Sequence, residues 1–584
     1  MHKNTLIKLI KASAKKITCD LVIKNVRIID VFNKTTFVDS VGVKDGFIIG
    51  IGNYEATETI DGTGKYICPG LTDAHCHIES STVTPDEYYK VALLNGITCV
   101  IADPHEIANV LGTSGIKFMI DSCKNIPFDA YFMLPSCVPG TSFENNGASL
   151  SACDLSQFYK NDRILGLGEV MDFVSVVNCN NPMVDKLYDA IKHKKVIDGH
   201  CAGLSEDIIN IYATAQILTD HECINKDEAL ERICRGMYVL IREGTAAKNL
   251  KDVLPAITES NSSRFCLCTD DKHIDDMFFN GSINTSIVSC INEGLKAELA
   301  ISMATLNPAT LYKLQNRGAI APGYIADFLL LDDLNDFKIN SVFKNGNLVV
   351  KNNKLLTNPN KSDINNTNIK NSINIPSLDA NSFNINITNK SVLNVMEIIP
   401  NKLETNHLSI DIVDDFKKQI DNSIFFNQSI DCDLLKIAVI ERHKNTGNIG
   451  LGVIKGLNIK FGAVATTIAH DSHNMIVAGC NDEDMIYACK ELKNINGGII
   501  IVNDGKILAS LSLEIGGLMT KRNHVDVVHE LSNLDKALKI IAPNINYNLF
   551  LTLSFLSLPV IPSLKITDRG IFDVCKFKFI DIAN

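Results

Sequence analysis

Eight short apolar runs, each ending in polar residues, occupy the middle of this chain. They are PGLTDAHCH, TCVIADPHE, AYFMLPSCVPG, ILGLGEVMD, KVIDGHCAG, AQILTDHEC, MYVLIREG and RFCLCTDD. Stretches with helical spacing, such as PDEYYKVALLNG and SEDIINIYATA, lie between several of the runs. Apolar runs that alternate with helices indicate buried parallel strands. Eight such units over about 250 residues predict a (β/α)8 barrel.

β-rich segments flank the predicted barrel of residues 69–320 on both sides. Residues 1–68 contain two such runs around the hairpin signal Asp45-Gly46, and residues 321–351 contain another pair around Asn345-Gly346. We expect the two segments to form one small β-sandwich beside the barrel.

The remainder of the chain falls into two stretches of different composition. Residues 352–392 are rich in Asn and Ser and weakly hydrophobic, which predicts a linker or a surface excursion without chemistry. Residues 393–584 contain apolar runs, a helical stretch DEDMIYACKELKNI and the hairpin pattern GGIIIVNDGKILASL. We expect a C-terminal α+β domain there, in a chain whose fold class is α/β.

Charge, hydropathy and cysteine usage exclude several partners. The net charge of −11 argues against nucleic acid or an anionic membrane as the main partner. No apolar run reaches the roughly 18 residues of a spanning helix. The N-terminus, MHKNTLIKLIKASAKKI, predicts a short amphipathic helix rather than a signal peptide. The 18 cysteines are scattered without a CxxC pair, which predicts reduced thiols in the cytoplasm.

Polar residues at the strand ends are candidate metal ligands, because barrel enzymes carry their chemistry at the carboxyl ends of the strands. Each residue alone could equally be a capped strand end or a buried, hydrogen-bonded histidine. Together they offer four imidazoles and two carboxylates, which zinc, iron and manganese all accept. Six ligands exceed the need of one catalytic ion, so we expect two ions bridged by Glu169. The six candidates are His75, His77, Glu169, His200, His221 and Asp270.

Motifs from about residue 20 to residue 584 resemble those of one known family. They include PGLTDAHCHIESS, ADPHEIANVLG, MLPSCVPGT, DGHCAGLS, RGMYVLIREGTAAKNL, LCTDDKHIDD, AHDSHNMIVAGCNDEDM and LPVIPSLKITDRGIFDV. In these motifs the chain resembles the adenine deaminase family of the amidohydrolase superfamily. One departure is Ala202 in GHCAGL, where we associate the family with proline.

The resemblance implies a metal-dependent hydrolase of purine salvage that converts adenine to hypoxanthine and ammonia. It implies a binuclear centre on the six candidate ligands, with Mn²⁺ favoured over Fe²⁺ or Zn²⁺, and a homodimer or larger assembly. The alternatives are another amidohydrolase, acting on a cyclic amide or an N-acetyl sugar, and a catalytically silent metal-binding homologue. Cyclic-amide members usually bridge their metals with a carboxylated lysine, whereas Glu169 occupies that position here.

Deamination at C6 requires a nucleophile and proton transfers to N1 and to the departing ammonia. We expect a metal-activated hydroxide as the nucleophile. Asp270 would take its proton and pass it to the amino group, while His221 would orient the attacking oxygen. Asp103 or Glu106 would protonate N1 or bind the purine edge. Alternatively, Asp103 caps the following helix, with Pro104 in its first turn.

Four further residues are candidates for binding the substrate: Ser136, Arg242, Glu243 and His473. Ser136 and the Arg242–Glu243 pair end the third and seventh predicted strands. Arg242 could equally be a structural ion-pair partner. His473 belongs to AHDSHN, with His470, Asp471 and Asn474. A dense polar turn of this kind is often only a turn, but we expect it to reach over the barrel mouth and help close the pocket.

Overall fold

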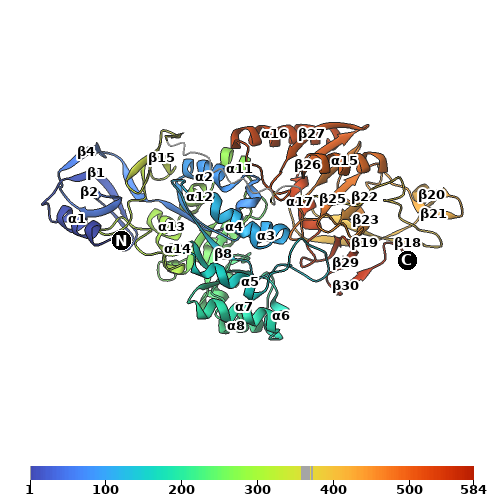
Figure 1. Cartoon of the computed structure of the whole chain (residues 1–584), viewed down its shortest axis with the longest axis horizontal. Helices are drawn as coiled ribbons and strands as arrows, with labels where there is room; N and C mark the ends of the chain where they lie inside the picture. Colours follow the sequence, from blue (N-terminus) through green and yellow to red (C-terminus); the bar gives the residue numbers. More distant parts are fainter. Residues whose placement is uncertain (1, 357–368, 370–371) are drawn as a thin grey trace.

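The computed structural model of the chain describes residues 2–356, 369 and 372–584. Its three parts follow one another along the long axis of the molecule (Figure 1). A curved β-sheet lies at one end, the barrel lies in the middle, and an α+β part with the C-terminus lies at the other end. Within the described residues, each helix is too short or too polar to span a membrane.

The first sheet combines segments from before and after the barrel, in the order β17-β16-β15-β14-β5-β1-β2-β3 with β4 beside β1. The sheet closes on itself where Ile48 N donates to Tyr324 O at 2.8 Å. The turns Asp45-Gly46 and Asn345-Gly346 have positive φ at both residues, as two-residue hairpin loops require, so both predicted hairpins are confirmed. The elements are α1 (Lys3–Ser13), β1 (Cys19–Asp30), β2 (Thr35–Lys44), β3 (Phe47–Ile51), β4 (Ala56–Asp61), β5 (Tyr66–Pro69), β14 (Phe328–Asp333), β15 (Lys338–Lys344), β16 (Asn347–Lys351) and β17 (Lys354–Leu355).

The predicted barrel is confirmed as a closed ring of eight parallel strands, β6 to β13. Strands β6 to β10 pair in sequence, and so do β11 to β13. Leu218 N donates to Ile197 O at 2.9 Å between the two groups, and Asp270 N donates to His75 O at 3.0 Å to close the ring. The strands are β6 (Leu71–Cys76), β7 (Ile97–Ala102), β8 (Asp129–Leu134), β9 (Ile164–Val170), β10 (Val196–Gly199), β11 (Thr219–Asp220), β12 (Tyr238–Arg242) and β13 (Phe265–Cys268).

Helices cover the outside of the barrel and join its strands, as the alternating pattern predicts (Figure 1). Their apolar faces pack against the strands in one large core. They are α2 (Pro85–Leu94), α3 (His105–Leu111), α4 (Thr113–Ser122), α5 (Ala152–Ser156), α6 (Phe173–Val177), α7 (Asn181–Lys192), α8 (Glu206–Thr214), α9 (Lys226–Cys234), α10 (Leu250–Val253), α11 (Ile274–Asn280), α12 (Ile283–Asn292), α13 (Ala297–Met303) and α14 (Leu306–Leu311).

The C-terminal part is built on a second sheet, ordered β19-β18-β23-β22-β25-β24-β26-β27. It contains the predicted helix as α15 and the predicted hairpin as β26–β27, and two small sheets, β20–β21 and β28–β30, lie beside it. Its elements are β18 (Val392–Ile398), β19 (Thr405–Asp411), β20 (Lys417–Ile420), β21 (Ser423–Phe426), β22 (Leu435–Ile440), β23 (Ile449–Lys455), β24 (Ala463–Thr466), β25 (Met475–Gly479), α15 (Asp482–Asn494), β26 (Gly498–Asn503), β27 (Lys506–Ser512), α16 (His524–Ile541), α17 (Leu549–Leu556), β28 (Leu564–Thr567), β29 (Gly570–Asp573) and β30 (Lys578–Ile580).

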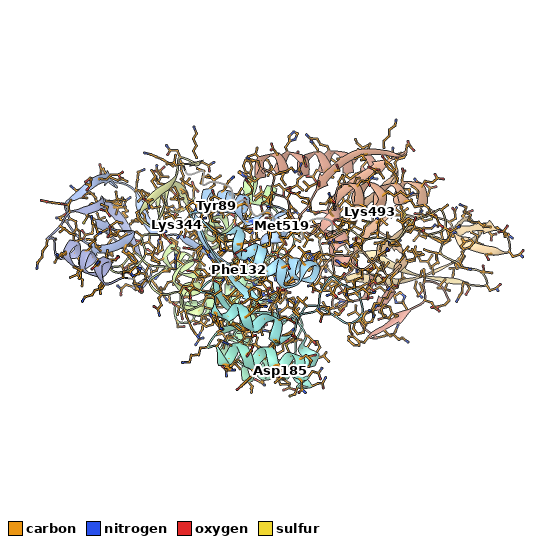
Figure 2. The ribbon with its side chains drawn as sticks, in the orientation of Figure 1. Tyr89, Phe132, Asp185, Lys344, Lys493 and Met519 are labelled. Carbon is orange, nitrogen blue, oxygen red and sulfur yellow. The ribbon has the colours of Figure 1, made fainter. Side chains whose placement is uncertain are left out.

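The C-terminal part bonds directly to the loop that follows the first barrel strand. Thr520 N donates to Thr82 O at 2.9 Å, and Thr84 N donates to Thr520 O at 3.1 Å. Met519, the preceding residue, is fully buried between the two parts (Figure 2). The C-terminal part therefore covers the end of the barrel at which the strand-end residues meet.

The stretch 352–392, predicted to be a linker, lies partly outside the described residues, because these do not include 357–368 and 370–371. Its later section contributes side chains to the core of the C-terminal part, and this section therefore belongs to the C-terminal fold. The side chains buried there include Ile373, Ile375, Leu378 and Phe383.

Candidate metal centre and active site

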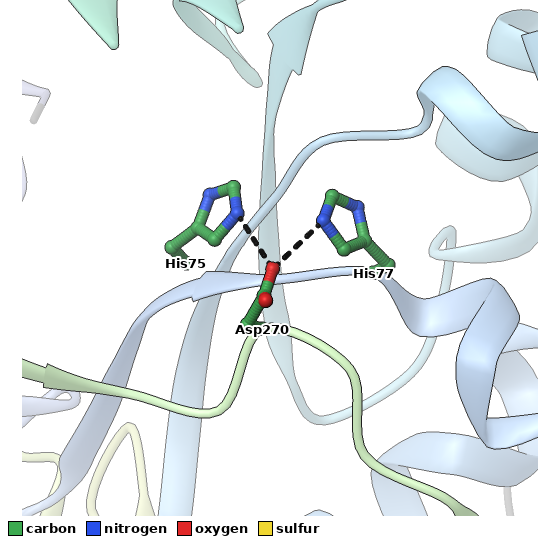
Figure 3. Close-up of side chains that lie close together, drawn as sticks. All are labelled: His75, His77 and Asp270. Carbon is green, nitrogen blue, oxygen red and sulfur yellow. Dashed lines mark hydrogen bonds and ion pairs between the residues drawn. The ribbon is translucent and has the colours of Figure 1, made fainter. Parts of the chain in front are cut away.

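The two histidines of the HCH motif share one carboxylate oxygen (Figure 3). His75 Nε2 and His77 Nε2 lie 3.3 and 3.1 Å from Asp270 Oδ1. Alternate residues at a strand end face the same side, and Cys76 between them is buried. Asp270 follows β13, and its backbone pairs with that of both histidines, so the closing of the barrel itself positions this triad.

Glu169, near the end of β9, lies between the two groups of histidines. Its Oε1 lies 3.2 Å from His77 Nε2 and 3.6 Å from His75 Nε2. Its Oε2 lies 3.0 Å from His200 Nδ1 and 3.3 Å from His221 Nε2. Each oxygen of one carboxylate thus faces a different pair of imidazoles, which is the arrangement that a bridge between two ions needs.

The six predicted ligands lie together in one group, the metal cluster, which consists of His75, His77, Glu169, His200, His221 and Asp270. Several atoms in or beside it that could bind a metal are buried without a hydrogen-bond partner: His75 Nε2, His105 Nδ1 and Glu169 Oε1. Buried polar atoms that lack a partner are costly, and a cation would satisfy them. Imidazole nitrogens and carboxylate oxygens suit Mn²⁺, Fe²⁺ and Zn²⁺. The residues therefore fit a divalent metal centre. Ligand atoms lie within 4.8 Å of one another in the sets His75–His77–Asp270, His75–Glu169–His221 and His200–His221–Glu222.

The two carboxylates of the cluster carry the negative charge that attracts a cation. Burial raises the pKa of Glu169, but the neighbouring His221 and His200 outweigh this effect and hold the pKa well below its usual value. Burial likewise raises the pKa of Asp270, while His75, His77 and Arg242 hold it well below its usual value. Both groups are therefore ionised at neutral pH.

Two further side chains reach the cluster, although the strand-end pattern did not single them out as ligands. Glu222 Oε1 lies 3.6 Å from His221 Nε2 and 3.8 Å from His200 Nδ1. His105 Nδ1 lies 3.4 Å from Glu169 Oε1. The signal in the sequence for Glu222 is its position directly after a candidate ligand at a strand end. His105 is the first residue of α3, and its approach depends on how that helix leaves β7.

Arg242, at the end of β12, joins two of these carboxylates. Its Nη1 donates to Asp270 Oδ2 at 2.8 Å and also to Glu222, and its Nη2 donates to Glu222 Oε2 at 3.0 Å. The guanidinium also lines the pocket described below. Arg242 is therefore an ion-pair partner of Asp270, in a place where substrate can reach it.

Four of the predicted catalytic or substrate-binding residues lie outside the pocket: Asp103, Ser136, Glu243 and His473. Asp103 does not cap α3, which has no side-chain cap, so that alternative is wrong. Its Oδ2 instead accepts a hydrogen bond from Glu169 N at 3.1 Å, and Ser136 Oγ donates to Glu169 O at 2.6 Å. These two residues hold the backbone of Glu169. Glu243 accepts from Leu250 N at 3.3 Å within a surface loop.

The AHDSHN turn, between β24 and β25, reaches Glu106 at the barrel mouth. His470 Nδ1 lies 2.5 Å from Glu106 Oε1, and His473 Nε2 hydrogen-bonds to the other oxygen, Oε2. His470 and Asp471 line the pocket, whereas His473 lies behind them. The predicted substrate-binding residue His473 therefore contacts Glu106 instead.

One pocket opens above the metal cluster, and residues from both parts of the chain form its walls. Its polar side includes Glu106, Arg242 and His470 together with five members of the cluster, which are His77, Glu169, His200, His221 and Asp270. Apolar walls with a few convergent polar groups are typical of small-molecule sites. The C-terminal part supplies five of the nine apolar side chains, which are Met171, Ala202, Ala246, Ala247, Leu403, Phe555, Leu558, Val560 and Ile561.

The chain matches known proteins over its whole length. Residues 66–349 match the amidohydrolase family, and residues 412–578 match the adenine deaminase C-terminal domain. An adenine deaminase from Geobacillus kaustophilus (strain HTA426) is 50% identical over 583 residues, which cover 100% of each chain. This chain belongs to the adenine deaminase family. Another adenine deaminase, from Bacillus subtilis (strain 168), is 45% identical over 584 residues and also covers 100% of each chain.

Each of the two family-matched segments contributes residues to the pocket. In this member of the adenine deaminase family, the metal cluster lies in the amidohydrolase segment and the AHDSHN turn lies in the C-terminal segment. Among solved structures, the chain is similar to a beta-aspartyl dipeptidase from Fervidobacterium islandicum AW-1. That match has a TM-score of 0.45 and 18% identity, and it covers 59% of this chain and 99% of the other.

Proposed function

We propose that this chain hydrolyses adenine to hypoxanthine and ammonia, as a step of purine salvage. The observation that carries the proposal is Glu169, whose two oxygens face different pairs of histidines at the floor of the pocket. The C-terminal part closes this pocket with residues of a segment found in adenine deaminases. The names of relatives that are 43–50% identical over nearly the whole chain give the substrate.

We propose two divalent ions as cofactor, Mn²⁺ first and Fe²⁺ or Zn²⁺ as alternatives. Their ligands would be the six strand-end residues, with Glu169 shared. Such ions, when bound, supply Lewis acidity that makes water a nucleophile near neutral pH.

Asp270 is the proton carrier of the proposed reaction. It is ionised, and Arg242 binds its Oδ2, which leaves Oδ1 directed at His75 and His77. From this position Asp270 would accept a proton from the attacking water and deliver it to the exocyclic amino group, which leaves as ammonia. His221, on the other side of Glu169, would orient the attacking oxygen.

We further propose that the protein works in the cytoplasm, as a homodimer or larger assembly. All 18 cysteines are thiols, as a reducing compartment would keep them. The oligomeric state stays a prediction from the family resemblance, and the net charge of −11 argues against nucleic acid as a partner.

Ammonia release from adenine, adenosine and guanine, measured with added Mn²⁺, tests the proposed function. We expect adenine to give by far the highest kcat/KM, with hypoxanthine formed in equal amount to ammonia. If the protein releases no ammonia from adenine but hydrolyses a cyclic amide or an N-acetyl sugar, the proposal is wrong and one of the alternative amidohydrolase functions is correct.

A further inference from the structure

Three histidines surround the buried carboxylate of Glu106, and two of them, His105 and His470, line the pocket. His470 Nδ1 lies 2.5 Å from Oε1, His105 Nε2 lies 3.3 Å from the same oxygen, and His473 Nε2 hydrogen-bonds to Oε2. Glu106 and the three histidines are each at most 5% exposed. Both oxygens of Glu106 are therefore occupied by protein groups.

The backbone fixes the tautomer of His473. Ala469 N donates a hydrogen bond to His473 Nδ1 at 3.1 Å, so Nδ1 carries no proton. The ring hydrogen of neutral His473 must then be on Nε2, which donates to Glu106. A metal ion at Glu106, His470 and His473 would require the lone pair of this same Nε2. The hydrogen bond from Ala469 therefore favours a proton network at Glu106 over another metal site.

His470 is held with one ring nitrogen toward Glu106 and its ring against the pocket wall. Its ring stacks on Phe555 with centroids 4.5 Å apart, and both side chains line the pocket. Its backbone is fixed on both sides, because its N–H donates to Ser554 O at 3.0 Å and its carbonyl accepts from Ser557 Oγ at 3.1 Å. Since Glu106 takes Nδ1, Nε2 is the ring nitrogen left for the substrate.

We infer that His470 is a catalytic residue of the C-terminal part that donates a proton from Nε2 to ring N1 of the purine, with Glu106 and His473 as positioning residues. This inference rests on the proposed function. It differs from the expectation from sequence, in which Glu106 or Asp103 was the acid. Asp103 lies outside the pocket, and Glu106 already accepts hydrogen bonds at both oxygens.

The charges at this site agree with that assignment. Burial lowers the pKa of His470, but the adjacent Glu106 outweighs burial and raises the pKa to about 9. Burial also raises the pKa of Glu106, while His470 and His473 hold it well below its usual value. The pair is thus an imidazolium and a carboxylate, and of the two only the imidazolium has a proton to give.

The protons balance in the resulting scheme. The water oxygen bonds to C6 as Asp270 takes one water proton and His470 transfers its Nε2 proton to N1. Asp270 then passes its proton to the amino nitrogen, the C6–N bond breaks, and ammonia leaves with the electron pair. The hydroxyl proton is released as the C6 carbonyl forms, and His470 regains one proton from solvent. Water has supplied one hydrogen to N1 and one to ammonia.

His470→Asn tests the inference in the metal-loaded, full-length protein. Asparagine places its amide near the position of Nδ1, beside Glu106, and removes Nε2. We expect kcat for adenine to fall by about 10²–10⁴-fold, the usual contribution of an acid catalyst. Glu106→Gln is a second variant with the same expected direction, because it leaves His470 without its carboxylate. His443→Asn is the matched control, since His443 contacts the same turn through Ser472 O but does not line the pocket.

Comparison of the KM of adenine with the Ki of 1-deazaadenine, which has C–H in place of N1, separates catalysis from folding. 1-Deazaadenine cannot accept the charged hydrogen bond from His470. In the wild type its Ki should therefore exceed the KM of adenine by about 10-fold or more. In His470→Asn the two values should converge, whereas His443→Asn should keep the wild-type difference and kcat. Wild-type kcat in either His470→Asn or Glu106→Gln, or a difference that survives in His470→Asn, would overturn the inference. A wild-type protein that releases no ammonia from adenine would instead overturn the proposed function.

Discussion

Asp270→Asn will lower kcat for adenine by about 10²–10⁴-fold, with the KM for adenine changed by only a few fold. Asparagine keeps the shape of the side chain and its contact with Arg242. It removes the charge that faces His75 and His77 and the ability to accept a proton from water. Because the pocket walls that would hold the purine are unchanged, the loss should lie in the chemical step. Steady-state rates of ammonia release on metal-loaded protein measure both constants.

Asp276→Asn is the control for that variant. Asp276 is also an aspartate near the end of the barrel, where it accepts from Lys272 Nζ at 2.9 Å and Thr245 Oγ1 at 2.8 Å, but it does not line the pocket. It should keep the wild-type kcat. Near-normal kcat in Asp270→Asn would show that another group carries the proton.

Glu169→Gln will bind fewer metal ions per chain than the wild type and will lose most of its activity. A neutral amide offers one oxygen and one N–H₂ group, so it cannot present an anionic oxygen to both pairs of histidines. Mutation of a residue that only hydrogen-bonds to a metal ligand typically lowers metal affinity by about 10- to 100-fold. Loss of the bridging carboxylate should have a larger effect. Elemental analysis after dialysis against a fixed free Mn²⁺ concentration, with kcat measured on the same samples, gives both quantities.

Glu87→Gln serves as the control for Glu169→Gln. Glu87 is another buried glutamate that bonds to a histidine, with His524 Nδ1 at 3.0 Å, but it lies away from the pocket. Its metal content should equal that of the wild type. Two ions per chain and full activity in Glu169→Gln would contradict the proposal that Glu169 bridges the two ions.

The strand-end pattern predicts the barrel and the convergence of the metal cluster because both follow from local periodicity. Each ligand lies within two residues of the end of a buried strand, and closure of the barrel brings these ends together whatever the conformation of the loops. The side-chain direction of Asp103 could not be read in this way. It depends on the φ and ψ angles of one loop, which turn its carboxylate back toward Glu169 N.

The contact between Glu106 and His470 cannot be predicted from local sequence patterns. The two residues are 364 positions apart, and they meet only because the C-terminal part docks on the barrel mouth. The same docking places Phe555 and Leu558 in the pocket wall. Composition predicts a linker at 352–392, but apolar side chains of its later section pack in the core of the C-terminal part. The low average hydropathy of the stretch hides these few buried positions.

Titration of metal-free protein with Mn²⁺, with ammonia release from adenine measured at each step, tests the central claim most directly. The account predicts no activity without metal and a rate that rises to its maximum at two ions per chain. Full activity in the metal-free protein, or no ammonia at any metal content, would contradict it.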